Sequence, residues 1–206
     1  MTPDALLLDR DGVLNSLWHE PDLGTVDSPH RPDQVRLMPG AAQAVRRANE
    51  AGVPVIVASN QPGIAKGKFT TRLLAAVTGT LVQLLAEQGA HVDHVYYCLH
   101  HPEAALPRLR ADCANRKPAP GLLRQAIQHR GLRAERCWFV GDTPSDIAAG
   151  QAAGCRTAWI GRTRCDVCPT RRSARPDLVA PDLMTAVTTI LEEPGDHREA
   201  LPRQCR

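Results

Sequence analysis

Short apolar runs alternate with segments of helical periodicity along most of this 206-residue chain. Apolar runs of this kind, bounded by turn residues, are typical of buried strands. Strands that alternate with helices form parallel βαβ units, in which helices cover both faces of a sheet. The alternation therefore predicts an α/β fold, a three-layer sandwich built on a mostly parallel sheet.

The pattern also predicts where the elements lie. Strands are expected at residues 5–8, 53–58, 94–97, 137–140, 156–160 and 178–179. Helices are expected at residues 41–51, 70–88, 120–130, 145–153 and 181–191, and several end at a glycine suited to a C-cap. We expect a single domain over residues 1–192 and a flexible tail over residues 193–206, where the periodicity is lost.

Polar residues stand directly after three of the expected strands, namely Asp9, Ser59 and Asp142. In open α/β sheets the ligand crevice lies beyond the carboxyl ends of the strands. Each residue taken alone could be a helix N-cap or a turn residue, and for Ser59 that interpretation would be favoured. The coincidence of all three, with Asp11 close by, favours a reactive site.

These residues suit phosphoryl transfer through a covalent intermediate. We expect Asp9 to attack phosphorus and form an acyl-phosphate, which water later cleaves. Asp11 would give the leaving oxygen a proton and then take one from the attacking water. Asp9, Asp142 and the Asp11 carbonyl would hold Mg²⁺, a hard cation that prefers oxygen ligands.

Other residues are expected to surround the transferred phosphate. Gly12 permits the tight backbone turn that directs amides toward it. Ser59 and the amide of Asn60 would bind a phosphoryl oxygen, and Lys117 would supply a fixed positive charge. We expect Asp146 to orient Lys117 or a metal-bound water.

Four segments resemble, in order, the motifs of haloacid-dehalogenase-type phosphatases. They are residues 9–15 (DRDGVLN), 59–61 (SNQ), 116–118 (RKP) and 141–146 (GDTPSD). Residues 60–69 and 96–102 are similar to those of the D,D-heptose 1,7-bisphosphate 7-phosphatases and their histidinol-phosphatase relatives. The resemblance extends from about residue 5 to about residue 162.

The resemblance implies a Rossmann-like core without a large cap domain, so loops must close the site. It makes residues 17–36 the substrate-facing loop, in which Trp18, His19, His30 and Arg31 are candidate contacts. Further substrate-binding candidates come from the motifs themselves: Asn60, Gln61 and Arg116.

The same resemblance implies a structural zinc loop, formed by Cys-x-His followed by Cys-x-Cys. Cys98 and His100 match its first half, and Cys113 its second, but Asn115 replaces the last cysteine. Structural zinc prefers four tetrahedral ligands, and an amide oxygen is a poor substitute for thiolate. The fourth ligand could come from Asp112, His101, or the Cys165 and Cys168 pair. Alternatively, the loop over residues 98–115 has lost its metal. The long interval between His100 and Cys113 favours the heptose branch over the histidinol branch.

Several other classes of protein are disfavoured. An odd count of seven cysteines without a secretory signal argues against a disulfide framework, and Cys137 and Cys155 are expected in the core. A net charge of +3 argues against nucleic-acid binding, and no window suits a membrane span. We expect a cytoplasmic monomer.

The function that the residues and the resemblance favour is a Mg²⁺-dependent phosphomonoesterase. Its expected substrate is a small phosphorylated metabolite, D-glycero-D-manno-heptose 1,7-bisphosphate, from which it would remove the C7 phosphate. The alternatives are histidinol phosphate or another small phosphoester, a non-catalytic binding protein of the same fold, and a nucleic-acid end phosphatase.

Overall fold

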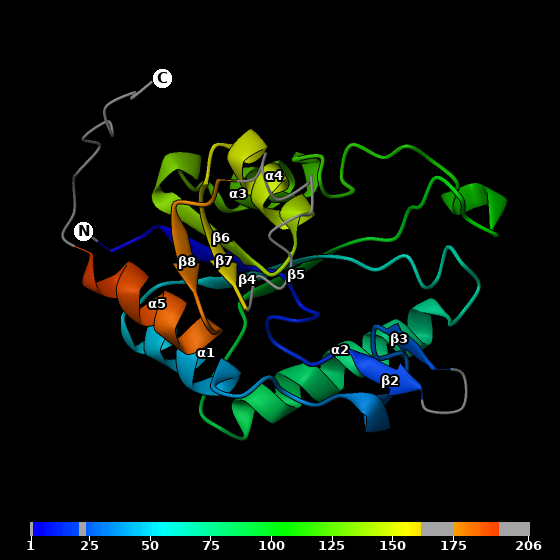
Figure 1. Cartoon of the computed structure of the whole chain (residues 1–206), viewed down its shortest axis with the longest axis horizontal. Helices are drawn as coiled ribbons and strands as arrows, with labels where there is room; N and C mark the ends of the chain where they lie inside the picture. Colours follow the sequence, from blue (N-terminus) through cyan, green and yellow to red (C-terminus); the bar gives the residue numbers. More distant parts are fainter. Residues whose placement is uncertain (1, 21–23, 162–174, 194–206) are drawn as a thin grey trace.

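The fold is a six-stranded parallel sheet covered by helices on both faces (Figure 1). The computed structural model describes residues 2–20, 24–161 and 175–193. The strand order is β5-β4-β1-β6-β7-β8, and every neighbouring pair is parallel. The strands are β1 (Ala5–Leu8), β4 (Val55–Asn60), β5 (His94–Cys98), β6 (Cys137–Gly141), β7 (Arg156–Ile160) and β8 (Leu178–Ala180). This order confirms the predicted fold class.

In the described part of the chain, five helices connect and cover these strands. They are α1 (Ala41–Glu50), α2 (Thr71–Ala86), α3 (Gly121–Arg130), α4 (Pro144–Ala153) and α5 (Leu183–Glu192). Each lies within two residues of its predicted bounds. Short 3-10 turns occur at Pro32–Gln34, Pro107–Leu109 and Ala134–Arg136.

Successive residues of the central strands point to opposite faces and fill two separate cores. Leu6 and Leu8 of β1 pack in a cluster with residues of α1, α2 and α5. Ala5 and Leu7 pack in a second cluster with residues of α3 and α4. Figure 1 shows the same division, with α3 and α4 above the sheet and the other helices below it. Burial on both faces explains why these strands read as continuous apolar runs.

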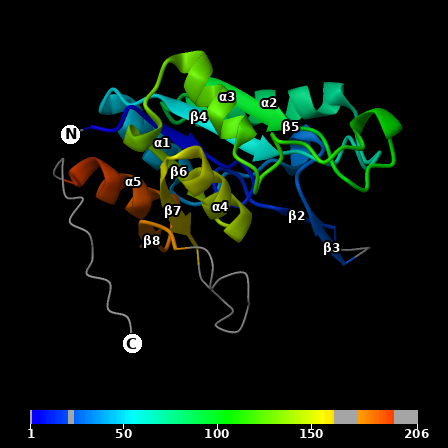
Figure 2. The same cartoon turned by 90° about the horizontal axis from the view of Figure 1, so that it is seen from above.

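Two expectations about loops differ from the structure. β4 extends to Asn60, so Ser59 lies inside the strand rather than after it, because pairing with β5 continues as far as Asn60 and Cys98. Residues 17–36, expected as a loop, contain an antiparallel hairpin of β2 (Trp18–Glu20) and β3 (Thr25–Asp27). In both Figure 1 and Figure 2 this hairpin projects to the right of the main sheet.

Cys137 and Cys155 are buried in the core, as predicted. Cys165, Cys168 and the expected tail from residue 194 onward lie outside the described residues. Within the described part of the chain, no helix is long and apolar enough to cross a membrane.

Candidate active site

Three carboxylates meet at the carboxyl ends of β1 and β6. Asp9 follows β1 and Asp142 follows β6, while Asp146 lies in the first turn of α4. The Asp9 amide donates to the Val140 carbonyl at 3.0 Å, which fixes the two strand ends side by side. Carboxylate oxygens from the three residues lie within 4.8 Å of one another. The crowding requires cations to offset the like charges.

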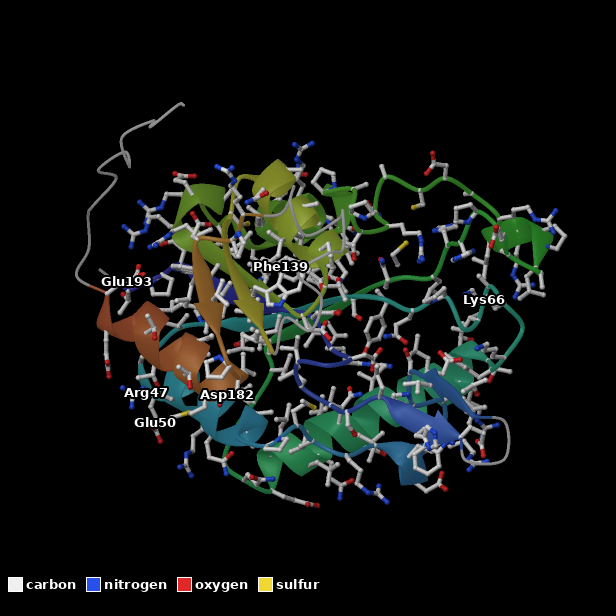
Figure 3. All side chains as sticks on the ribbon, in the orientation of Figure 1. Arg47, Glu50, Lys66, Phe139, Asp182 and Glu193 are labelled. Atoms are coloured by element: carbon white, nitrogen blue, oxygen red, sulfur yellow. The ribbon has the colours of Figure 1, made fainter. Side chains whose placement is uncertain are left out.

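Lys117 is the cation supplied by the protein. Its Nζ lies 2.8 Å from Asp9 Oδ1 and 2.7 Å from Asp146 Oδ1, and it donates to the Ala58 carbonyl at 3.1 Å. The ammonium also stands 5.2 Å from the ring centroid of Phe139, a residue labelled near the middle of the view in Figure 3. Burial works against the charged lysine, but Asp9 and Asp146 outweigh it and raise the Lys117 pKa. The residue is therefore a fixed positive charge.

The backbone around Lys117 is tied to the second strand of the site. The side-chain amide of Asn60 donates to the Lys117 carbonyl at 3.0 Å, and its oxygen accepts from the Lys117 amide at 3.1 Å. The two hydrogen bonds resemble those between paired strands, and they join the end of β4 to the backbone of Lys117. The Asn60 side chain, which was expected to contact substrate, therefore positions Lys117.

The site carries more negative charge than Lys117 alone balances. Burial, then Asp146 and Asp9, raise the pKa of Asp142 to about 7. Burial and the Asp146 charge likewise raise the pKa of Asp9, although Lys117 opposes them. Asp142 Oδ1 is buried and has no hydrogen-bond partner among the described residues. An oxygen-rich site with an orphaned carboxylate oxygen fits a hard divalent cation.

Gly12 makes this carboxylate arrangement possible. Its backbone has a φ of +82°, and a Cβ there would lie 2.1 Å from Asp142 Oδ2. Any side chain would displace the Asp142 carboxylate, so the predicted need for glycine has both a conformational and a steric cause. Asp146 was expected to orient Lys117 or a water. It contacts Lys117 and also accepts from the Thr143 amide at 3.1 Å, capping α4.

Asp11 lies within a separate set of hydrogen-bond donors. Its Oδ1 accepts from Arg10 Nε at 3.0 Å and from Asn15 Nδ2 at 2.8 Å. Its Oδ2 accepts from Gln61 Nε2 at 2.7 Å and from Ser28 Oγ at 2.8 Å. Arg10 Nη2 contacts both oxygens. These donors fix the orientation of the carboxylate.

Arg10 is fully buried beneath this carboxylate. Its guanidinium stands 5.7 Å from the ring centroid of Tyr97, whose hydroxyl lies 3.0 Å from Thr78 Oγ1. Burial works against the charged guanidinium, but Asp11 outweighs it, and the Arg10 pKa is raised. A buried guanidinium needs a counter-ion, and Asp11 is that partner.

The remaining substrate-binding candidates are placed differently. Ser59 and Gln61 are buried in the site, where Gln61 Nε2 lies 3.2 Å from Ser59 Oγ. Arg116 is half-buried and donates to the His100 carbonyl at 3.3 Å. His19 is exposed on β2, and no contact among the described residues joins it to the carboxylates.

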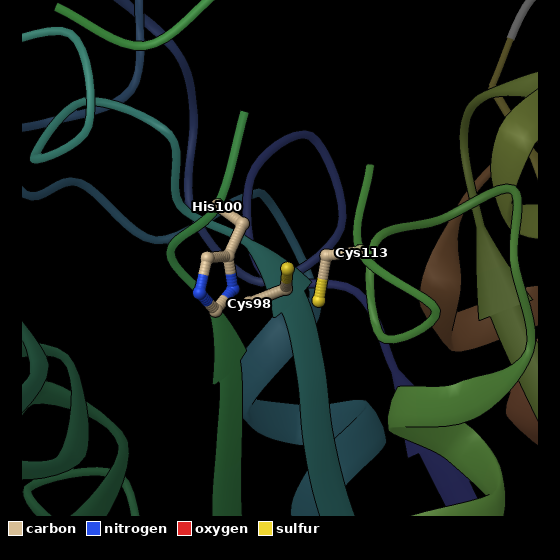
Figure 4. A group of neighbouring side chains, drawn as sticks. All are labelled: Cys98, His100 and Cys113. Atoms are coloured by element: carbon tan, nitrogen blue, oxygen red, sulfur yellow. The ribbon is translucent and has the colours of Figure 1, made fainter. Parts of the chain in front are cut away.

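Cys98, His100 and Cys113 form a second cluster beside the site. Their ligand atoms lie within 4.8 Å of one another, and Figure 4 shows the side chains gathered around one point. Asn115 is not part of this group: its amide donates to Gln125 Oε1 at 3.3 Å, and its oxygen lies against Gly121 at the start of α3. Two thiols and one imidazole are ligands that zinc prefers, so the donor set fits three of four positions.

Arg10, Asn15 and Ser28 were missed as site residues from the sequence. Arg10 and Asn15 stand inside the DRDGVLN segment, so their place in that motif was the available signal. Ser28 had none, because its contact with Asp11 depends on the path of the hairpin.

Comparison with known proteins places this geometry in a family. Residues 114–186 match the HAD-hydrolase-like family. A protein from Mesorhizobium japonicum, named D-glycero-beta-D-manno-heptose-1,7-bisphosphate 7-phosphatase, is 37% identical over 188 residues, which cover 90% of this chain and 83% of that protein. The chain belongs to the heptose bisphosphate phosphatase family.

Other members of the heptose bisphosphate phosphatase family are also similar to this chain in sequence and structure. One from Pseudomonas aeruginosa is 38% identical over 160 residues, covering 78% of this chain and 82% of its own. A crystal structure of D,D-heptose 1,7-bisphosphate phosphatase from B. bronchiseptica, complexed with magnesium and phosphate, has a TM-score of 0.75 at 31% identity and covers 91% of this chain and 98% of its own. The expected family, fold class and phosphatase activity are confirmed.

Proposed function

We propose that this chain removes the C7 phosphate of D-glycero-D-manno-heptose 1,7-bisphosphate, preferring the β anomer. Relatives 34% to 38% identical carry that substrate in their names. The observation that carries the chemistry is the Asp9–Lys117–Asp146 arrangement beside Asp142, in which a buried carboxylate at a strand end is held by a fixed cation. It supports nucleophilic attack on a phosphate.

In the first half of the reaction, a carboxylate oxygen of Asp9 attacks phosphorus while the bond to the sugar oxygen breaks. Asp11 gives that oxygen its proton, so the sugar leaves as a neutral alcohol. In the second half, Asp11 takes a proton from water, which attacks the acyl-phosphate and frees Asp9. Lys117 keeps Asp9 in place throughout and offsets its charge.

The residues that would hold Mg²⁺ are Asp9, Asp142 and the Asp11 carbonyl. The buried, unpartnered oxygen of Asp142 supports this assignment. When bound, the cation reduces the repulsion between an anionic nucleophile and an anionic phosphate. Asp146 is already engaged by Lys117 and Thr143, so we assign it to positioning rather than to the metal.

We also propose a zinc ion on Cys98, His100 and Cys113, with the fourth position left to a ligand other than Asn115. Asn115 is directed toward α3 by Gln125, which supports this incomplete set. His101 is a weaker candidate for the fourth position, because its Nδ1 already accepts from the Glu103 amide at 3.1 Å. The metal would brace the loop that leads from β5 to Arg116 and Lys117.

The test is phosphate release with Mg²⁺ from both heptose 1,7-bisphosphate anomers, fructose 1,6-bisphosphate and histidinol phosphate. We expect kcat/KM for the β anomer to exceed the others by about a hundredfold, equivalent to ~2.7 kcal/mol of transition-state discrimination. Equal activity on all four would remove the heptose assignment and leave the phosphatase chemistry.

The mechanism is tested by Asp9→Asn, which keeps the side-chain volume and removes the nucleophile. We expect no turnover above about a thousandth of the wild-type rate. A suitable control is Glu50→Gln on α1, because the Glu50 side chain is 68% exposed and pairs only with Arg46 in the described structure. Normal turnover by Asp9→Asn would overturn the covalent mechanism.

A further inference from the structure

In its described part, the inserted segment, residues 17–36, contacts the Asp11 carboxylate through a single hydroxyl. Ser28 directly follows β3, and its Oγ donates to Asp11 Oδ2 at 2.8 Å. This is the one hydrogen bond that joins the described part of the segment to Asp11. The other donors to Asp11 come from the strand ends and the turn after β1.

Ser28 is held in this place by its neighbours. Its amide donates to Asp27 Oδ1 at 2.9 Å, and the other oxygen of Asp27 is paired with the Lys68 ammonium. Two residues further on, the His30 ring is stacked on Phe69, with centroids 6.1 Å apart and planes 12° from parallel. Lys68 and Phe69 belong to the loop that follows β4, so the segment is fastened across the site at two points.

The turn beyond Ser28 is also fixed. The Gln34 side-chain oxygen accepts from the His30 amide at 3.0 Å and from the Arg31 amide at 3.1 Å. Gln34 is 1% exposed, so these bonds are shielded from water. These hydrogen bonds fix the backbone on the C-terminal side of Ser28, and so help to hold its hydroxyl in place.

The chemistry of Asp11 gives this hydroxyl a particular value. Proton transfer needs an Asp11 carboxyl group of fixed orientation. Arg10, Asn15 and Gln61 hold it from the strand ends and the turn after β1, and Ser28 adds the contact from the hairpin side. Without the Ser28 hydroxyl, Asp11 Oδ2 would be held only by Gln61 and Arg10 among the described residues.

We propose that Ser28 is a positioning residue, through which the inserted segment sets the orientation of Asp11 for proton transfer. The inference rests on the proposed function, since Asp11 has a proton to transfer only if Asp9 attacks a phosphate. In that step the Asp11 proton moves to the leaving oxygen as the phosphorus–oxygen bond breaks. Poor alignment of Asp11 should slow this transfer most for leaving groups that need the proton.

The experiment compares Ser28→Ala with wild type on 4-nitrophenyl phosphate and phenyl phosphate. The two esters are alike in size, but only phenolate is a poor enough leaving group to need much help from an acid. The value of kcat/KM covers the steps up to departure of the leaving group, and so isolates the first half-reaction. Ser28→Thr restores a hydroxyl. Ser16→Ala is a matched control, because the Ser16 hydroxyl donates only to the Arg36 carbonyl among the described residues, and the carbonyl of Ser16 that accepts from Asn15 is kept in the variant.

We expect Ser28→Ala to lose about tenfold or more in kcat/KM on phenyl phosphate and less than about threefold on 4-nitrophenyl phosphate. Ser28→Thr should recover most of that loss, and Ser16→Ala should match wild type. An equal loss on both esters, or no loss on either, would overturn the inference. If the wild-type chain hydrolyses neither ester nor any sugar phosphate, it is the proposed function that fails.

Discussion

Removing the charge of Asp142 should make the metal-free protein more stable. The carboxylates of Asp9, Asp142 and Asp146 gather within 4.8 Å, and the Lys117 ammonium contacts the other two but not Asp142. Asn has nearly the same shape as Asp and carries no charge. The variant Asp142→Asn therefore removes an electrostatic cost while leaving the packing in place.

The expected gain in stability follows from the pKa of Asp142. Burial and the neighbouring acids raise the Asp142 pKa from 3.8 to about 7. About three pKa units at ~1.4 kcal/mol each set an upper bound of about 4 kcal/mol on the cost of ionising the residue in the folded state. Because Asp142 keeps some contact with solvent, we expect a gain of about 2 to 4 kcal/mol in the free energy of unfolding.

The direction of the Asp142 pKa shift determines the pH range over which stability changes. A raised carboxyl pKa means that the folded chain binds this proton more tightly than the unfolded chain does. The Asp142 contribution to stability is therefore lost as pH rises from about 4 to about 7. The difference between wild type and Asp142→Asn should be small near pH 4 and reach its full size above pH 7.

The assay is thermal unfolding with a chelator present, from pH 4 to pH 8. At pH 8 we expect the Tm of Asp142→Asn to exceed that of wild type by at least about 4 °C, since 1 kcal/mol shifts a domain of this size by about 2 to 4 °C. Added Mg²⁺ should raise the Tm of wild type and not that of the variant. Asp33→Asn, at an exposed position, should follow wild type. A variant less stable than wild type at pH 8, or a pH-independent difference, would refute the electrostatic reasoning.

Three further predictions concern neighbouring positions. Gly12→Ala should lower kcat/KM by about a hundredfold or more while the circular dichroism spectrum stays native, because a methyl group would lie 2.1 Å from Asp142 Oδ2; activity within tenfold of wild type would contradict this. Lys117→Met should abolish turnover and cost about 3 to 5 kcal/mol of stability in urea unfolding, because it leaves buried carboxylates unpaired; a stable, active variant would be inconsistent with a fixed charge. Asn115→Cys should tighten zinc binding at least about tenfold in a chelator competition, because it can complete a tetrahedral set; unchanged affinity would show that residue 115 does not reach the metal.

The sheet and its reactive edge could be predicted because local sequence determines them. Buried parallel strands such as β1 and β6 appear as continuous apolar runs, and a polar residue at the end of each is placed by the strand itself. Asp9 and Asp142 meet in space because both strands end at one edge of the sheet. Nothing beyond the strand pattern was needed to bring them together.

The support around Asp11 could not be predicted in the same way. Arg10 is a residue type that is almost always exposed, and only the carboxylate beside it makes its full burial possible. Ser28 reaches Asp11 across 17 residues of chain, through a hairpin whose three-residue strands are too short and too exposed to show periodicity. The exposure of His19 depends on the same hairpin. Such contacts depend on the path of the chain in three dimensions.

The amide ladder between Asn60 and Lys117 has a consequence for how this enzyme can diversify. It anchors the lysine directly to β4, and the Arg116 amide donates to the Cys113 carbonyl at 2.8 Å just before it. Residues 101–112 therefore lie between two anchored segments. Insertions or deletions there would leave the lysine on its anchor to β4, so the length of this loop can vary in evolution independently of the charge that holds Asp9.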